Sequence, residues 1–300
     1  MGVGDVSEAV WYTGDALEVL KTLPSESVDL VITSPPFLAL RSYLPADDPN
    51  KHLEMGAEAT PGLFVDGLMR VVEECRRVLA PHGSIALELG DTYAGSGASG
   101  WERDKGIYRS ENRSQASAEG KLEQQRDLSS GWPLAKSLSL IPETVRFTMV
   151  YGFNPHTGRE TEQWRLRNVV RWCRPNPPVG ALGDKYRPAT TELMIFAKNA
   201  KRFFDLDAVR TPNVNPEPTR IVTPALKKSL TKGNTSEVGD TMNNNPNGSP
   251  PLDYWEIPTQ PYRGAHYATW PTRLLEIPMK SMVPRRVCVV CGKPSERITE

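Results

Sequence analysis

The sequence predicts an α/β fold with three layers, in which helices cover both faces of a doubly wound sheet. Residues 28–33 (VDLVIT) and 84–89 (SIALEL) are short apolar runs, as expected for buried parallel strands. Between them, residues 63–79 place apolar side chains on one face of a helix. A strand, a helix and a second strand in this order make the right-handed crossover from which such sheets are built.

The elements before the first of these strands are short. Residues 9–12 read as a strand, and residues 15–23 as a short amphipathic helix for which Asp15 is a suitable N-cap. The strand at 28–33 must stop at Pro35 and Pro36, because proline has no N–H to donate to a neighbouring strand.

Further elements are expected after the second strand. They are a helix at 142–151, strands at 168–173, 191–197 and 202–206, and a last helix at 271–282 that begins with Pro271 and contains an awkward Pro278.

Two polar stretches interrupt this pattern. Residues 94–136 are rich in Gly, Ser, Gln and charge, and residues 211–253 hold seven Pro and seven Asn. The second stretch cannot bury enough apolar surface to offset the entropy of ordering it, so we expect a mobile loop there.

Composition excludes several classes of protein. Charged residues make up 24% and hydrophobic residues 38% of the chain, which fits a globular protein, and no run of about 18 apolar residues predicts a membrane span. The N-terminus lacks the basic-then-apolar pattern of a signal peptide. Of the four cysteines, Cys75 and Cys173 sit in apolar periodic stretches, which is typical of reduced core residues in a cytoplasmic protein.

The net charge is zero, but the charges are unevenly distributed. Residues 1–60 carry ten acids and three bases, whereas residues 159–210 carry eleven bases and six acids. The basic stretch fits either a surface that faces nucleic acid or a solvated charged face. Its candidate phosphate contacts are Arg165, Arg167, Arg171 and Arg174.

The segment Ser34-Pro35-Pro36-Phe37 brings together groups that could hold an amino group on a planar ring. The Ser34 hydroxyl and the Pro35 carbonyl can accept hydrogen bonds, and Phe37 offers a face for stacking. The two prolines fix the backbone at the carboxyl end of a strand, where α/β proteins bind ligands.

These residues carry a resemblance. The catalytic motif of the DNA amino-methyltransferases, which modify cytosine N4 or adenine N6, is similar to DLVITSPPF. The opening of the circularly permuted group of that family resembles the longer segment GDALEVLKTLPSESVDLVITSPPF. His266-Tyr267-Ala268-Thr269-Trp270-Pro271 resembles the family segment beside the cofactor, and residues 167–198 resemble the stretch beside the target-base pocket. The likeness covers about two-thirds of the chain.

The resemblance implies a Rossmann-like fold that binds S-adenosylmethionine. It implies that Ser34, Pro35, Pro36 and Phe37 are catalytic. Residues that would bind the cofactor are Asp15, Thr33, His266, Ala268, Trp270 and Pro271.

One family element is missing from the sequence. No D-P-F-x-G-x-G segment follows Trp270, so we expect the chain to be truncated before the glycine-rich cofactor loop. Residues 90–97 (GDTYAGSG) have a similar glycine pattern. We interpret it as coincidental, because it follows the catalytic motif and no helix pattern comes after it.

Cys288 and Cys291 have the spacing of half a zinc knuckle. They predict either the first two ligands of a zinc site in the full-length protein or two incidental thiols.

The resemblance therefore favours a DNA methyltransferase that acts on double-stranded DNA. We expect it in the cytoplasm of a prokaryote or encoded by a phage, without membrane association. A cognate restriction endonuclease is a candidate partner. Serine before Pro-Pro favours cytosine N4 over adenine N6. Other hypotheses are a methyltransferase of RNA or protein amides, and a non-catalytic DNA-binding relative or inactive fragment.

The implied division of the chain has six parts. They are the catalytic half (1–93), a polar insertion (94–137), a continuation beside the target base (138–210), a mobile loop for target recognition (211–253), a cofactor-side helix (254–284) and the start of a zinc-knuckle insertion (285–300).

Overall fold

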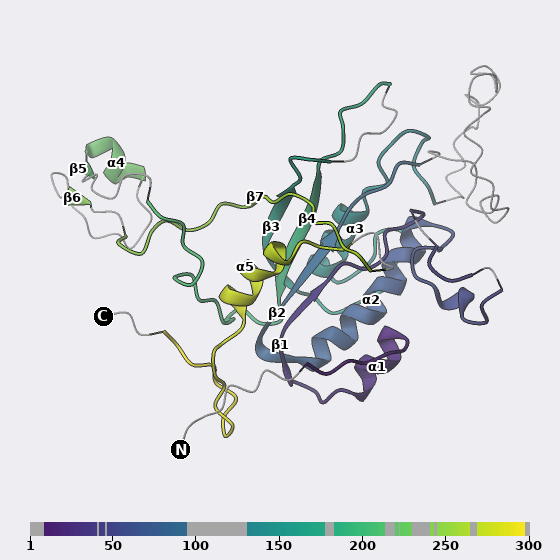
Figure 1. Cartoon of the computed structure of the whole chain (residues 1–300), viewed down its shortest axis with the longest axis horizontal. Helices are drawn as coiled ribbons and strands as arrows, with labels where there is room; N and C mark the ends of the chain where they lie inside the picture. Colours follow the sequence, from purple (N-terminus) through teal and green to yellow (C-terminus); the bar gives the residue numbers. More distant parts are fainter. Residues whose placement is uncertain are drawn as a thin grey trace.

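The computed structural model has a five-stranded sheet at its centre, in the order β1-β2-β4-β3-β7 (Figure 1). The strands are β1 (Val28–Thr33), β2 (Leu79–Leu89), β4 (Thr190–Ala197), β3 (Arg165–Cys173) and β7 (Tyr254–Glu256). β1 and β2 are parallel, as are β3 and β7, whereas β4 is antiparallel to both of its neighbours. The sheet is therefore mixed, with β4 running against the other four strands.

The structure describes residues 9–40, 42–45, 47–94, 131–177, 183–213, 220–221, 223–229, 241–242, 245–264 and 269–297.

Helices cover both faces of the sheet, as the sequence predicts. On one face, α2 (Pro61–Val78) and α3 (Ile141–Tyr151) pack on the sheet, and α1 (Ala16–Thr22) lies beside α2. On the other face, α5 (Thr272–Met282) lies over β1 and β2 (Figure 1). The three-layer α/β architecture is confirmed.

Each face has its own apolar core. The larger core joins α2 residues such as Phe64 and Leu68 to Ile85 and Leu87 of β2 and to Phe196 of β4, all of them buried. The smaller core joins Met282 of α5 to sheet residues from the opposite face, namely Ala86, Val170, Leu193 and Ile195. Adjacent residues of one strand thus enter different cores, because side chains alternate across a sheet.

Most predicted elements are present within a few residues of the expected bounds, and β1 has the predicted ones. Two predicted strands are wrong. Residues 9–12 form no strand, and Trp11 is 90% exposed. A strand exists only through a partner, and in the described part of the chain β1, the outer strand of the sheet, pairs with β2 alone.

The second incorrect strand is the one predicted at residues 202–206. Its backbone N–H groups bond to two separate elements instead of one strand: Phe203 donates to the His82 carbonyl at 3.0 Å, and Asp205 to the Ser281 carbonyl at 2.8 Å. This segment is therefore held by contacts to the turn at His82 and to α5, and not by a strand ladder.

The described parts of the polar stretch at 211–253, with β5 (Arg220–Ile221), α4 (Pro224–Ser229) and β6 (Thr241–Met242), lie away from the sheet (Figure 1). Its ends are joined by reciprocal backbone hydrogen bonds of 2.9 and 2.8 Å between Thr211 and Ser249. Within it, β5 and β6 are paired antiparallel. Among described residues, no helix has the length and apolar character needed to cross a membrane. The six-part division of the chain stays a prediction.

Candidate active site

The Ser34 hydroxyl lies at the edge of the sheet where β1 and β2 end. Thr33, the last residue of β1, is paired with Leu87, so the next residue of each strand faces the same space. Ser34 Oγ donates a hydrogen bond of 2.6 Å to Oε2 of Glu88. The carboxyl ends of the two parallel strands thus bring together two side chains that are 54 residues apart.

Glu88 joins a third segment to this edge. Its side chain is buried, with the residue 2% exposed, and its Oε2 also accepts a hydrogen bond of 3.3 Å from Nε1 of Trp270. Sequence reasoning missed Glu88. The available signal was one ionisable residue inside an otherwise apolar strand, since a buried acid needs a specific partner.

The Phe37 ring packs against Gly90, the residue after β2. A Cβ on Gly90 would lie 2.6 Å from Cε2 of Phe37 and 3.2 Å from Cγ2 of Thr191, so no side chain fits between them. The Phe37 ring is therefore held between the end of β2 and the start of β4, half-buried against the main core. Pro35 and Pro36 are also half-buried, whereas Ser34 is exposed.

Asp91 connects this edge to α3. Its carboxylate accepts the N–H groups of Leu140 and Ile141, at 2.9 and 3.2 Å, and so caps the start of the helix. Burial raises the pKa of Asp91. Gly90 and Asp91 therefore both have structural roles. Gly95 and Gly97 lie outside the described residues, so the interpretation of this glycine pattern as coincidental stays a prediction.

A buried carboxylate and two arginines flank the same edge. Glu192, 3% exposed, pairs with Arg146 at 2.9 Å and with Arg171 at 2.8 Å. Burial raises the pKa of Glu192, and the two arginines oppose this effect. The guanidinium of Arg174 lies 5.1 Å from the Trp172 ring centroid. Burial lowers the pKa of Arg174, while the charge of Glu88 acts in the opposite direction.

The four arginines predicted to contact phosphates occupy different places. Arg171 and Arg174 lie where β3 ends, near the Ser34 edge. Arg165 lies at the start of β3 and donates to the Lys198 carbonyl at 3.2 Å, and Arg167 is exposed along the strand. The described structure thus brings two of the four to the candidate site.

The predicted cofactor residues are brought together in part. Thr33 ends β1, Trp270 contacts Glu88, and Pro271 is the N-cap residue of α5. The Asp15 carboxylate caps α1 by accepting the Glu18 N–H at 3.1 Å, as predicted for this residue. His266 and Ala268 lie outside the described residues.

Cys288 and Cys291 lie in a tight exposed hairpin. Gly292, at φ +67°, donates to the Cys288 carbonyl, and Cys288 donates to the Lys293 carbonyl, both at 2.9 Å. The pKa of Cys288 is lowered because the backbone N–H groups of Cys291 and Val290 bond to its sulfur. The described residues contain no group of three or more His, Cys, Asp or Glu side chains able to hold a metal ion.

Comparison with known proteins gives a consistent set of similarities. A family model described as DNA methylase matches residues 28–284. The chain is 29% identical over 203 residues to Type II methyltransferase M.SfiI of Streptomyces fimbriatus, an alignment that covers 67% of this chain and 39% of that protein. It is 27% identical over 267 residues to Type II methyltransferase M.XycI of Xanthomonas campestris pv. cyanopsidis, covering 88% of this chain and 69% of that protein.

Among solved structures, the PvuII DNA methyltransferase, described as cytosine-N4-specific, superposes with a TM-score of 0.50 and 17% identity. The superposition covers 91% of this chain and 70% of that one. The structural similarity supports the fold. The chain spans about two-fifths of M.SfiI and about seven-tenths of M.XycI and the PvuII enzyme.

Proposed function

This chain belongs to the DNA methylase family, and from that premise we propose that it transfers a methyl group from S-adenosylmethionine to the exocyclic amino group of a base flipped out of double-stranded DNA. The observation that carries the proposal is the 2.6 Å hydrogen bond from Ser34 to buried Glu88, beside Phe37 and Trp270, at the carboxyl ends of two parallel strands. The Rossmann-like fold places ligands at that edge.

The chemistry requires help because the lone pair of an amino nitrogen is delocalised into its ring. The hydroxyl proton of Ser34 is held by Glu88, so the lone pairs of Ser34 Oγ are left to accept an amino N–H. The Pro35 carbonyl is a second candidate acceptor, and the Phe37 ring a stacking face. These contacts favour a nitrogen whose lone pair points at the methyl donor.

Once the amino nitrogen has bonded to the methyl group it carries a positive charge, which is removed when the nitrogen loses a proton. We propose that the amino proton moves to Ser34 Oγ while the hydroxyl proton of Ser34 moves to Oε2 of Glu88. The base is then neutral, and Glu88 carries the released proton until it returns through the exposed Ser34 hydroxyl to solvent. The Ser34–Glu88 pair is thus sufficient to accept the proton that the amino group releases.

S-adenosylmethionine, when bound, supplies an electrophilic methyl group on a positively charged sulfur. The buried negative charge of Glu88 at the Ser34 edge fits a cation. Thr33, Trp270 and Pro271 would hold the cofactor from this side, and Asp15, His266 and Ala268 are assigned to it by resemblance.

We favour cytosine N4 as the target because serine stands before Pro-Pro and because the PvuII enzyme, which superposes on this chain, is described as cytosine-N4-specific. Adenine N6 is the alternative. A DNA adenine methyltransferase of Escherichia coli, YhdJ, is 40% identical over 72 residues, or 24% of this chain. Digestion of methylated DNA to nucleosides, followed by mass spectrometry, decides between them. A methyl group found only on adenine would overturn the cytosine assignment alone.

The proposal has a rival of another class, a non-catalytic DNA-binding relative or inactive fragment. Transfer of tritium from methyl-labelled S-adenosylmethionine to duplex DNA tests the two. Incorporation that is lost in Ser34→Ala supports the enzyme, whereas DNA binding without incorporation supports the rival. The Ser34–Glu88 pair supports the enzyme because it lies at the sheet edge where this fold binds ligands.

Two further assignments go with this function. Arg165, Arg167, Arg171 and Arg174 are proposed DNA contacts, of which Arg171 and Arg174 lie nearest the site. A restriction endonuclease is a proposed partner because the two relatives are Type II methyltransferases, and a cytoplasmic location is proposed with it.

Cys288 and Cys291 are proposed as two of four ligands of a zinc ion. Their hairpin supports this assignment because it holds both cysteines in one tight turn, and hydrogen bonding lowers the pKa of Cys288 towards the thiolate form that a metal ion binds.

A further inference from the structure

The 39–56 loop leaves the candidate active site directly after Phe37 and returns to it. The N–H of Ala39 donates to the Gly56 carbonyl at 2.8 Å. Gly56 is buried at φ +95°, and a Cβ there would lie 3.1 Å from the carbonyl oxygen of Phe37 and 3.3 Å from Cβ of Pro36. The returning arm of the loop therefore packs on the backbone of the catalytic motif.

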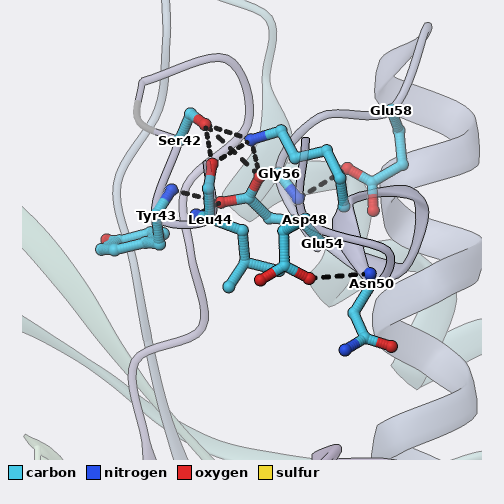
Figure 2. Close-up of polar contacts among 9 residues, drawn as sticks. Ser42, Tyr43, Leu44, Asp48, Asn50, Glu54, Gly56 and Glu58 are labelled. Atoms are coloured by element: carbon cyan, nitrogen blue, oxygen red, sulfur yellow. Dashed lines mark hydrogen bonds and ion pairs between the residues drawn. The ribbon is translucent and has the colours of Figure 1, made fainter. Parts of the chain in front are cut away.

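A partly buried ion pair between Lys51 and Glu54 lies at the centre of this loop (Figure 2). The side chain of Glu54 is 6% exposed, and its carboxylate accepts the N–H groups of Tyr43 and Leu44, the latter at 3.2 Å. The ammonium of Lys51 donates to Glu54, to the Ser42 hydroxyl and, at 2.9 Å, to the Leu44 carbonyl. The pair thus joins the outgoing arm of the loop to the returning arm.

The Glu54 carboxylate stays ionised in this setting. Burial by itself would raise the pKa of Glu54, but the hydrogen bonds from Lys51, Tyr43 and Leu44 outweigh it and lower the pKa. The large apolar side chains of Leu40, Tyr43 and Leu53 are 43 to 56% exposed, so they do not form a core under the loop. Met55 packs against the main core at the base of the loop, so the ion pair holds the part of the loop that has no apolar core of its own.

Gly56 is held from more than one side. Its carbonyl accepts from Ala39, and its N–H donates to Oε2 of Glu58 at 2.8 Å. Glu54 lies two residues before this point, so the position of its carboxylate sets where the chain enters Gly56. A change at Glu54 or Lys51 is therefore transmitted through Gly56 to Phe37.

We propose that Lys51 and Glu54 are positioning residues of the active site. Their ion pair keeps the 39–56 loop closed, Gly56 then packs on Phe37, and the Phe37 ring stays against Gly90. Neither side chain needs to touch DNA or cofactor. The catalytic consequence rests on the proposed methyl transfer, whereas the structural consequence does not.

The test uses Glu54→Gln, Lys51→Met and the double variant in the full chain. The control is Glu18→Gln, which breaks the exposed Lys21–Glu18 pair of 2.7 Å on α1. Hydrogen exchange followed by mass spectrometry should show the Ala39 amide exchanging at least tenfold faster in each variant, with peptides from β2 unchanged. The control should match wild type in both.

Methyl transfer supplies the second measurement. We expect kcat to fall at least tenfold, KM for S-adenosylmethionine to stay within twofold, and Lys51→Arg to recover part of the loss. The double variant should lose no more than either single variant, because the two side chains act as one unit.

Unchanged exchange at Ala39, or faster exchange throughout β2, overturns the proposal. If wild type transfers no methyl group, the proposed function fails. The exchange result still decides whether the ion pair holds the motif.

Discussion

Ser34 and Glu88 form a hydrogen bond of 2.6 Å across the ends of two neighbouring parallel strands. Ser34 is exposed and follows β1, whereas Glu88 is buried near the end of β2. The bond ties an accessible hydroxyl to a carboxylate that water does not reach freely. A serine oxygen with its proton held in this way is a better acceptor than a free hydroxyl, because its negative partner polarises it.

Replacement of either member of this pair should impair catalysis without unfolding the protein. We expect Ser34→Ala to lower kcat for methyl transfer at least about a hundredfold, or roughly 2.7 kcal/mol of barrier. Glu88→Gln keeps a hydrogen-bond acceptor but loses the charge, so it should lower kcat by about tenfold or more. Single-turnover assays with labelled cofactor measure both, and circular dichroism monitors folding. Activity within about threefold of wild type in Ser34→Ala would remove Ser34 from the mechanism.

Gly90→Ala should displace the Phe37 ring. The new Cβ would lie 2.6 Å from Cε2 of Phe37, well inside van der Waals contact. We expect a loss of stability of about 1–3 kcal/mol, as for other overpacked sites, and a loss of activity comparable to that of Phe37→Ala. Thermal unfolding and methyl-transfer rates provide the measurements.

Gly183→Ala is the matched control for Gly90→Ala, because a Cβ at Gly183 meets nothing within 4 Å. It should leave both properties near wild type. Equal effects of the two variants would show that the contact with Phe37 is not what Gly90 provides.

The chain should bind S-adenosylmethionine weakly. This expectation rests on the interpretation that the glycine pattern at 90–97 is coincidental, which leaves only Asp15, Thr33 and residues 266–271 as assigned cofactor contacts. We expect isothermal titration calorimetry to give a Kd weaker than about 100 μM. A Kd near 1 μM, about −8 kcal/mol, would instead make the glycine pattern at 90–97 the cofactor loop.

Zinc should be bound at less than one ion per chain. Cys288 and Cys291 offer two thiolates, and a structural zinc site takes four ligands. Elemental analysis of protein purified with zinc present measures the ratio, with Cys288→Ser as the control. One tightly held ion per chain that is lost in Cys288→Ser would contradict the prediction and require ligands from elsewhere.

The sequence alone determined the order of the main elements and the place of the Ser-Pro-Pro-Phe motif at the end of a strand. VDLVIT is apolar on both sides and ends at two prolines, so the strand and its end at Thr33 follow from side-chain chemistry and from the missing proline N–H. The helix at 61–78 follows from apolar spacing in the same way. Such features depend on neighbours in the chain, which a sequence displays directly.

Whether a strand-like segment finds a partner could not be predicted from the sequence in this way. Residues 9–12 have the composition of a strand but no partner in the described part of the chain, and residues 202–206 bond to two different elements. The antiparallel direction of β4 was likewise decided by pairing with β2 and β3. Composition shows which residues can form a strand, whereas long-range hydrogen bonding decides whether they do.

The residues of the candidate site likewise fall into those evident from the motif and those placed there only by the tertiary structure. Ser34 and Phe37 were evident from the motif, but Glu88, 54 residues beyond Ser34, becomes part of the site only through the register of β1 against β2. Gly56 and Glu54 enter because the 39–56 loop folds back onto Phe37. The sequence determined which groups could react. The tertiary structure decided which buried charges and backbone contacts hold them, because those depend on distances that chain order does not encode.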